Sequence, residues 1–150
     1  MSSVKPLILL SLLVVAACWN SFPGAFHYDD YALMLENPRM IELSFQDVLF
    51  QFGGRPLTLW TFSLQQPSTD ARPEIYHMVN VLLHLVIVLL LFLMIRRLSG
   101  DPFTGFVAAA LFAVHPVQSF AFNYIWARSV LLLAFFGLLA DGRDGHDRDP

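Results

Sequence analysis

Apolar residues gather in four stretches of the chain, with polar segments between them. The stretches cover residues 6–19, 76–95, 103–114 and 120–140. A helix needs about 20 mostly apolar residues to cross a bilayer, and turns or charges bound each stretch. The pattern predicts an all-α integral membrane protein with three full transmembrane helices and a partial fourth.

The first stretch, residues 6–19, allows more than one interpretation. It is shorter than the roughly 20 residues of a straight span, so it is either a transmembrane helix or the hydrophobic region of a signal peptide. Residues 15–18 (VAAC) also match a bacterial lipoprotein cleavage box. The apolar character continues through Trp19, a residue type suited to an interfacial anchor, which favours the span. The transmembrane and lipoprotein interpretations both place the chain from Asn20 onward on the non-cytoplasmic side.

A long polar and aromatic loop, residues 21–74, separates the first two stretches. It contains more acidic than basic residues, whereas Lys5 precedes the first stretch and a pair of arginines follows the second. By the positive-inside rule, the N-terminus is then cytoplasmic and the loop is lumenal or periplasmic. Residues 41–52 and 56–65 each have apolar residues on one helical face, which predicts interfacial helices lying on the bilayer.

The third stretch begins at a predicted tight turn on the cytoplasmic side. Asp101 is suited to cap the following helix, and Pro102 to be its first residue. Gly105, Ala109 and Ala113 recur at four-residue spacing and form a face of small residues. Such a face predicts close packing against a neighbouring helix.

The fourth stretch contains Arg128, which leaves two alternatives. Residues 120–140 form one span with Arg128 inside it, or a short outer helix runs to Trp126 and a new span begins near Arg128. The second is favoured because a charged residue at the bilayer centre is costly. Residues 129–140 would then cover only about 18 Å of a hydrocarbon core about 30 Å thick, so this span is predicted to be partial.

Composition agrees with a membrane protein. Hydrophobic residues make up 56% of the chain, charged residues 14%, and the mean hydropathy is +0.57, which is more apolar than an ordinary soluble domain. The net charge of −3 includes no block of basic residues, so no nucleic acid partner is expected. The single cysteine, Cys18, excludes an intrachain disulfide.

The last ten residues differ from the rest. Residues 1–140 are predicted to form the membrane module, whereas residues 141–150 switch to charge and glycine. We expect a disordered tail, either a truncated or frame-shifted end or a genuine acidic cytoplasmic tail.

Two adjacent carboxylates, Asp29 and Asp30, follow the first stretch by about ten residues, close to the outer membrane surface if that stretch spans the bilayer. One carboxylate there can take a proton from an incoming hydroxyl, while its neighbour holds a divalent cation or orients a sugar. A low-dielectric surrounding raises a carboxyl pKa, which suits a general base. By spacing alone, the pair is more typical of a helix cap or a solvated turn.

Polar residues also interrupt the second stretch. His77, Asn80 and His84 fall at i, i+3 and i+7, on one helical stripe that should face protein or a cavity rather than lipid. The two histidines lie about 10.5 Å apart along the helix axis, too far to ligate one ion together. The spacing favours a hydrogen-bonded stripe between helices over a metal site.

Three further residues are candidates for binding an anion. Arg55 and Arg128 are placed at the predicted outer interface, where a guanidinium suits phosphate. Snorkelling or pairing at a helix end is the alternative for both. His115, before Pro116, marks the start of an outer loop, and alone it is typical of a helix stop.

Taken in order, four segments carry a family resemblance: FHYDDYALMLENP, RPLTLWTFSLQ, YHMVNVLLHLVIVLLLFL and AALFAVHPVQSFAFNYIWARSVLLLAFF. The chain resembles, over roughly residues 5–140, the N-terminal part of GT-C membrane glycosyltransferases. It is most similar to the branch in which this module precedes tetratricopeptide repeats, which includes the transmembrane and tetratricopeptide-repeat O-mannosyltransferases and their bacterial relatives.

The resemblance implies a multispanning enzyme that transfers a sugar from a polyprenyl- or dolichyl-phosphate donor to a hydroxyl of a protein or glycan acceptor on the lumenal or periplasmic side. It places the acidic catalytic residue at Asp30 or Asp29, with Asp30 preferred, and either would bind any divalent cation. It places His115 and Arg128 near the donor phosphate. Such enzymes have many more spans, so we expect this chain to be inactive on its own. A small non-enzymatic membrane assembly or lipid-binding protein is the rival interpretation.

Overall fold

The computed structural model describes residues 4–27, 30, 46, 55–69 and 72–144. The named elements are α1 (Val4–Cys18), the 3-10 helix η1 (Trp19–Ser21), α3 (Pro56–Thr69), α4 (Pro73–Ser99), α5 (Pro102–Val114), α6 (Gln118–Asn123), the 3-10 helix η4 (Ile125–Ala127) and α7 (Arg128–Asp144). All regular elements in these residues are helical, which confirms the prediction of an all-α chain for the described part.

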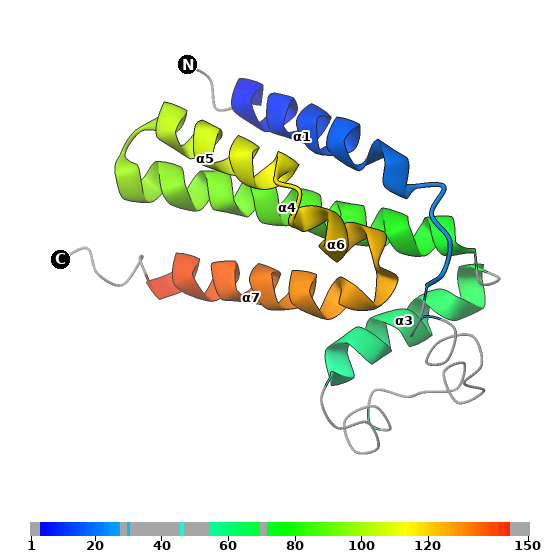
Figure 1. The fold of residues 1–150 in the computed structure, drawn as a ribbon. Coiled ribbons are helices and arrows are strands. Elements are labelled where there is room, and N and C mark those ends of the chain that lie inside the picture. Colours follow the sequence, from blue (N-terminus) through cyan, green and yellow to red (C-terminus); the bar gives the residue numbers. More distant parts are fainter. Residues whose placement is uncertain (1–3, 28–29, 31–45, 47–54, 70–71, 145–150) are drawn as a thin grey trace.

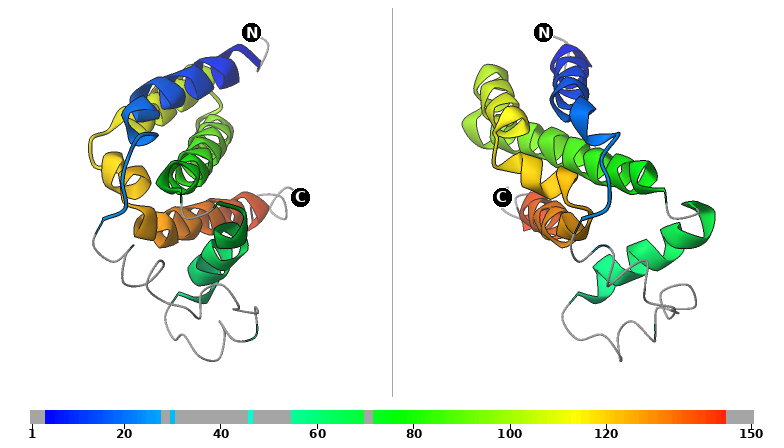
Figure 2. Two further views of the ribbon diagram at one scale, coloured as in Figure 1. Left: turned by 90° about the vertical axis from the view of Figure 1, so that its right-hand side faces the viewer. Right: turned by 45° about the vertical axis from the view of Figure 1, so that its right-hand side comes forward.

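The helix α4 is the centre of the bundle. It packs against α1 and α5 on one side and α7 on the other (Figures 1 and 2). Val88 and Phe92 of α4 are buried with residues of α1 and α5, whereas Ile87 is buried with Leu131 of α7. Because α4 is apolar around most of its circumference, it can bury several sides at once.

Two helical stretches, Val4–Ser21 and Pro73–Ser99, are long and apolar enough to cross a membrane. The helix α5 has 13 residues and α7 has 17, so they extend about 20 Å and 26 Å, less than a hydrocarbon core about 30 Å thick. The two long apolar helices suggest a membrane protein. The predicted count of three full spans and a partial fourth is not confirmed.

The turn between α4 and α5 follows the prediction. Gly100 adopts a φ of 69° at the end of α4, in the left-handed region that favours glycine. The Asp101 side chain caps α5 by accepting hydrogen bonds from the amides of Phe103 (3.2 Å) and Thr104 (2.8 Å). Pro102 is the first residue of the helix.

The face of small residues on α5 is buried as predicted. Gly105, Ala109 and Ala113 are its buried residues. A Cβ at Gly105 would lie 3.0 Å from the backbone nitrogen of Arg96 on α4. The glycine therefore allows the two helices to approach closely at this crossing.

The fourth apolar stretch is divided, as the favoured alternative predicts. The helix α6 ends at Asn123, η4 covers Ile125–Ala127, and α7 begins at Arg128. The helix α7 continues to Asp144, so the first residues of the segment 141–150 are helical.

The helix α3 begins at Pro56, as predicted, and continues to Thr69. It lies at one end of the bundle and runs at an angle to it (Figure 1). Of the other predicted loop helix, residues 41–52, only Gln46 is among the described residues.

Candidate functional site

Asp30 is buried and ties the segment after α1 to the connection between α6 and α7. It has no exposed surface. Its Oδ2 accepts a hydrogen bond from the amide of His27 at 2.9 Å, and its Oδ1 accepts one from the amide of Trp126 at 3.1 Å. The second bond joins positions 96 residues apart, so Asp30 is a long-range anchor of the fold.

Burial also changes the acidity of this carboxyl group. Desolvation raises the pKa of Asp30, and it outweighs the two backbone hydrogen bonds and the nearby charges of His77 and His27, which lower the pKa. A carboxylate that is held in place and has a raised pKa is a better proton acceptor than a solvated one.

The Trp126 amide can reach Asp30 because the helix is broken there. In a continuous α-helix this N–H would donate to the carbonyl of Phe122, four residues earlier. Instead, the Phe122 carbonyl accepts a hydrogen bond from Nδ1 of His77 at 3.1 Å. A carbonyl can only accept, so Nδ1 carries the proton. The helix therefore lacks the hydrogen bond from the Trp126 amide to the Phe122 carbonyl. Asp30 accepts from that amide, and His77 donates to that carbonyl.

Asn80 and His84 continue this pattern along α4. The side-chain amide of Asn80 donates to the carbonyl of Ile125 at 3.2 Å. Nε2 of His84 lies 3.4 Å from the carbonyl of Ala113, near the end of α5. Like His77, both side chains are buried. The structure therefore places this polar stripe against carbonyl groups at helix ends rather than against lipid.

Arg128 lies inside the protein at the start of α7, with no exposed surface. Its Nε donates to Oδ1 of Asn80 at 2.8 Å, its Nη1 to Oγ1 of Thr61 at 3.3 Å and its Nη2 to the carbonyl of Tyr76 at 3.3 Å. The guanidinium carbon also lies 4.2 Å from the centre of the Phe62 ring, a favourable cation–π distance. One side chain therefore connects α3, α4 and α7.

An aromatic cluster surrounds this arginine. The Trp126 ring stacks on Phe62, with centroids 5.7 Å apart. Tyr76 contacts both Phe62 and Phe26. These side chains fill the space between α3, α4 and the α6–α7 connection, and they keep water from the buried guanidinium.

The remaining predicted residues lie apart from this cluster. His115 is exposed, and its Nδ1 accepts a hydrogen bond from the amide of Val117 at 3.2 Å, as befits the end of α5. Arg55 is exposed just before α3. Neither hydrogen-bonds to Asp30 or Arg128. Asp29 lies outside the described residues.

Some partners in the cluster were not predicted. Thr61 is 67 positions from Arg128, and no motif or spacing connects them. Trp126 directly precedes Ala127 and Arg128, which belong to the family resemblance. Its position next to them was the sequence signal that could have pointed to Trp126. Among the residues that the structure describes, no group of three or more histidine, cysteine, aspartate or glutamate side chains is arranged to hold a metal ion.

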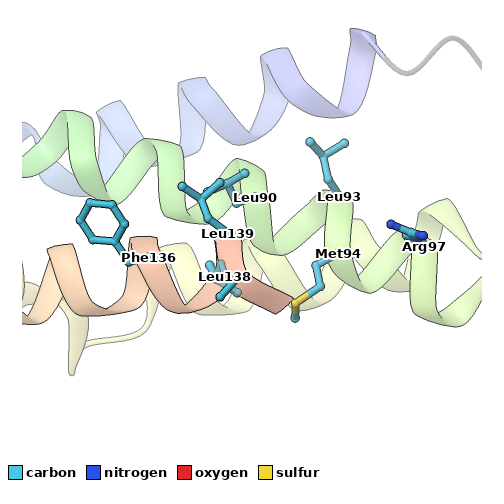
Figure 3. A pocket seen from close by; sticks show the side chains of 8 residues that line it. Leu90, Leu93, Met94, Arg97, Phe136, Leu138 and Leu139 are labelled. Carbon is cyan, nitrogen blue, oxygen red and sulfur yellow. The ribbon is translucent and has the colours of Figure 1, made fainter. Parts of the chain in front are cut away.

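A cavity of about 710 Å³ lies between α4 and α7 (Figure 3). Leucines and Phe136 form most of its wall, and Arg97 is its charged residue. It adjoins residues 90–97 of α4, toward the opposite end of that helix from His77 and Asn80. Asp30 is not among the described residues that line it.

Comparison with known proteins identifies relatives that are named protein O-mannosyl-transferases. Mouse protein O-mannosyl-transferase TMTC3 is 36% identical over 148 residues, which cover 89% of this chain and 16% of the relative. Human TMTC3 is 32% identical, with 92% and 16% covered, and Drosophila Tmtc1 is 38% identical, with 87% and 17% covered. The chain thus spans about one sixth of the length of these relatives.

No protein-family model matches the chain, and no solved structure matches it. The relatives nevertheless agree with one another in name and cover nearly the whole chain, as the resemblance of the four segments predicts. Along about nine-tenths of its length, the chain is a homologue of the transmembrane and tetratricopeptide-repeat O-mannosyltransferases.

Proposed function

We propose that this chain is part of a membrane glycosyltransferase of the GT-C type. The proposed reaction transfers a sugar from a polyprenyl- or dolichyl-phosphate carrier to a hydroxyl of a protein or glycan, on the lumenal or periplasmic side of the membrane. The names of the relatives support mannose as the sugar and a protein as the acceptor. The two long apolar helices support a membrane location.

The proposed catalytic base is Asp30. In this mechanism its carboxylate takes the proton of the acceptor hydroxyl, while that oxygen forms a bond to the anomeric carbon of the sugar. The bond from that carbon to the phosphate oxygen breaks, and the phosphate leaves with the electron pair. The observation that carries the assignment is a buried carboxylate with a raised pKa, held at a break between two helices. Each carboxylate oxygen keeps a further lone pair for the acceptor.

Arg128 is assigned a positioning role. It connects three helices next to Trp126, whose amide holds Asp30. Its positive charge also favours an anionic phosphate near this wall. Arg55 and His115 have exposed side chains that a lipid phosphate can reach, and they are assigned to its first contact.

A chimera tests this proposal, because the chain aligns with 148 residues of the mouse relative. The aligned segment of mouse TMTC3 is replaced by this chain, and mannose transfer from dolichyl-phosphate mannose to a serine- and threonine-containing peptide is measured in membranes. We expect the chimera to be active and Asp30→Asn to lower the rate by about 10²- to 10⁴-fold. Glu74→Gln, which removes an exposed carboxylate at the first turn of α4, is the matched control and should leave the rate unchanged.

The amount of folded protein is measured for each variant by size-exclusion chromatography, so that rates are compared per folded molecule. If Asp30→Asn keeps the rate per folded molecule, Asp30 is an anchor and not the base. Loss of activity in Asp29→Asn alone would move the role to that neighbour. An inactive chimera that is fully folded would overturn the proposal that this segment serves transfer.

A further inference from the structure

A second cavity lies at the end of the bundle where α1 begins, α4 ends and α5 begins. Its volume is about 440 Å³, within the range of small-molecule and lipid-headgroup sites. Leu9 of α1, Phe92 of α4 and the phenylalanines 103 and 106 of α5 give it apolar walls. Charged residues line the same space, which distinguishes it from an ordinary gap between helices.

We call this second cavity the corner cavity. The helices around it are closely packed. A Cβ at Gly105 would lie 3.0 Å from the backbone nitrogen of Arg96 and 3.1 Å from the carbonyl oxygen of Phe92. The backbones of α4 and α5 therefore touch on one side of the cavity, and α1 packs against both helices. Regular helices rather than loops supply most of the lining.

With α4 as a membrane span, this cavity would lie at the depth of the lipid headgroups. The candidate span α4 ends at Ser99, and Arg96 is in its last turn. Basic side chains at such positions extend toward the membrane surface while their methylene groups follow the apolar wall. The corner cavity thus passes from an apolar region to a charged rim within one helical turn of the end of the span.

The charges at this rim have both signs. Lys5 and Arg96 are cationic, and Asp101 is anionic. Hydrogen bonds from the Thr104 hydroxyl and from the backbone amides of Thr104 and Phe103 hold the pKa of Asp101 below its ordinary value. The carboxylate therefore remains charged near neutral pH.

This arrangement selects among phospholipid headgroups. One phosphodiester charge suits the two cations, and a neighbouring ammonium suits the carboxylate. A neutral glycerol headgroup would leave Asp101 without a cationic partner, and a second negative charge on the headgroup would be repelled by Asp101. A trimethylated amine has no N–H group to donate.

We propose that the corner cavity binds phosphatidylethanolamine. Its phosphate lies between Lys5 and Arg96, and its ammonium donates to Asp101. Its acyl chains follow the apolar wall formed by Leu9 and the α5 phenylalanines. This site is separate from Asp30 and does not depend on the proposed transfer reaction.

Native mass spectrometry of the purified chain in detergent tests the site. The protein is mixed with equal amounts of phosphatidylethanolamine, phosphatidylglycerol and phosphatidylcholine that carry the same acyl chains, and retained lipid is counted. We expect phosphatidylethanolamine to be retained most. Lys5→Gln and Arg96→Gln should each lower its retention about fivefold, since a basic side chain near a lipid phosphate contributes about that factor. Asp101→Asn should abolish the preference over phosphatidylcholine, while asparagine still caps α5.

Arg97→Gln is the matched control. It removes an equal charge from the same helix end, but Arg97 lines the other cavity, so retention should not change. Helicity is checked by circular dichroism for every variant. Equal retention of the three lipids, a preference for phosphatidylglycerol, or equal losses in Arg96→Gln and Arg97→Gln would overturn the proposal.

Discussion

Arg128→Lys gives the sharpest prediction about what holds the site together. Lysine keeps the positive charge, but its single ammonium group cannot reach acceptors on Asn80, Thr61 and Tyr76 at once. If two of the three hydrogen bonds are lost, each worth about 1.5–3 kcal/mol to a charged group, the simple sum is about 3–6 kcal/mol. Partial compensation lowers the expected cost to about 3 kcal/mol. For a chain of this size, that loss lowers the unfolding temperature by about 6–12 °C.

The assay is thermal unfolding in detergent, followed by tryptophan fluorescence and by circular dichroism. Arg55→Lys is the control, because Arg55 is exposed before α3 and such changes usually stay within about 0.5 kcal/mol. A shift below about 2 °C in Arg128→Lys, or an equal shift in both variants, would refute the reasoning that the guanidinium fork joins three helices.

Two further predictions concern the same end of the bundle. Gly24→Ala should destabilise the chain by about 1–3 kcal/mol, because a Cβ there would lie 2.6 Å from Nε2 of His77. The control Gly137→Ala, where a Cβ would have nothing within 4 Å, should instead stabilise α7 slightly. Equal unfolding temperatures of the two variants would contradict this prediction. Since burial raises the folded pKa of Asp30, its contribution is fully present below the unfolded pKa of about 3.9 and is lost as pH rises through the folded pKa. The stability of wild type minus that of Asp30→Asn should therefore fall as the pH rises above about 4, and a flat or rising difference in unfolding midpoints would count against it.

Local chemistry made much of the fold predictable. Pro56 at the start of α3 and the Asp101 cap of α5 act through neighbouring residues, so the sequence displays them directly. The break in the helix before Arg128 was predictable, because a charged side chain in the middle of an apolar span costs free energy. The small face on α5 followed from four-residue spacing alone.

Long-range pairings could not be predicted in the same way. The bond from Trp126 to Asp30 depends on how the chain returns after α5, and no local preference records it. The burial of Arg128 could not be predicted for the same reason. The sequence placed this residue at an outer interface instead. The number of full spans also depends on where helices end, and α5 ends at Val114, two residues before Pro116, which has no N–H to donate.

The polar stripe on α4 and the breaks in the following helices are two parts of one arrangement. Where a helix is interrupted, its carbonyl groups lose their partners, and in an apolar surrounding each unsatisfied group costs several kcal/mol. His84, Asn80 and His77 stand on successive turns of one face, and they meet the carbonyls of Ala113, Ile125 and Phe122 in turn. The Ile125 carbonyl also accepts a hydrogen bond from the backbone amide of Arg128, so the side chain of Asn80 is its second donor. The helix α4 can therefore support an irregular backbone beside it, and the Trp126 amide left over is the one that holds Asp30. The carboxylate of Asp30 thus both completes the hydrogen bonding at the helix break and is the proposed base. A substitution at Asp30 changes both roles, so every test of catalysis there has to be paired with a measurement of folding.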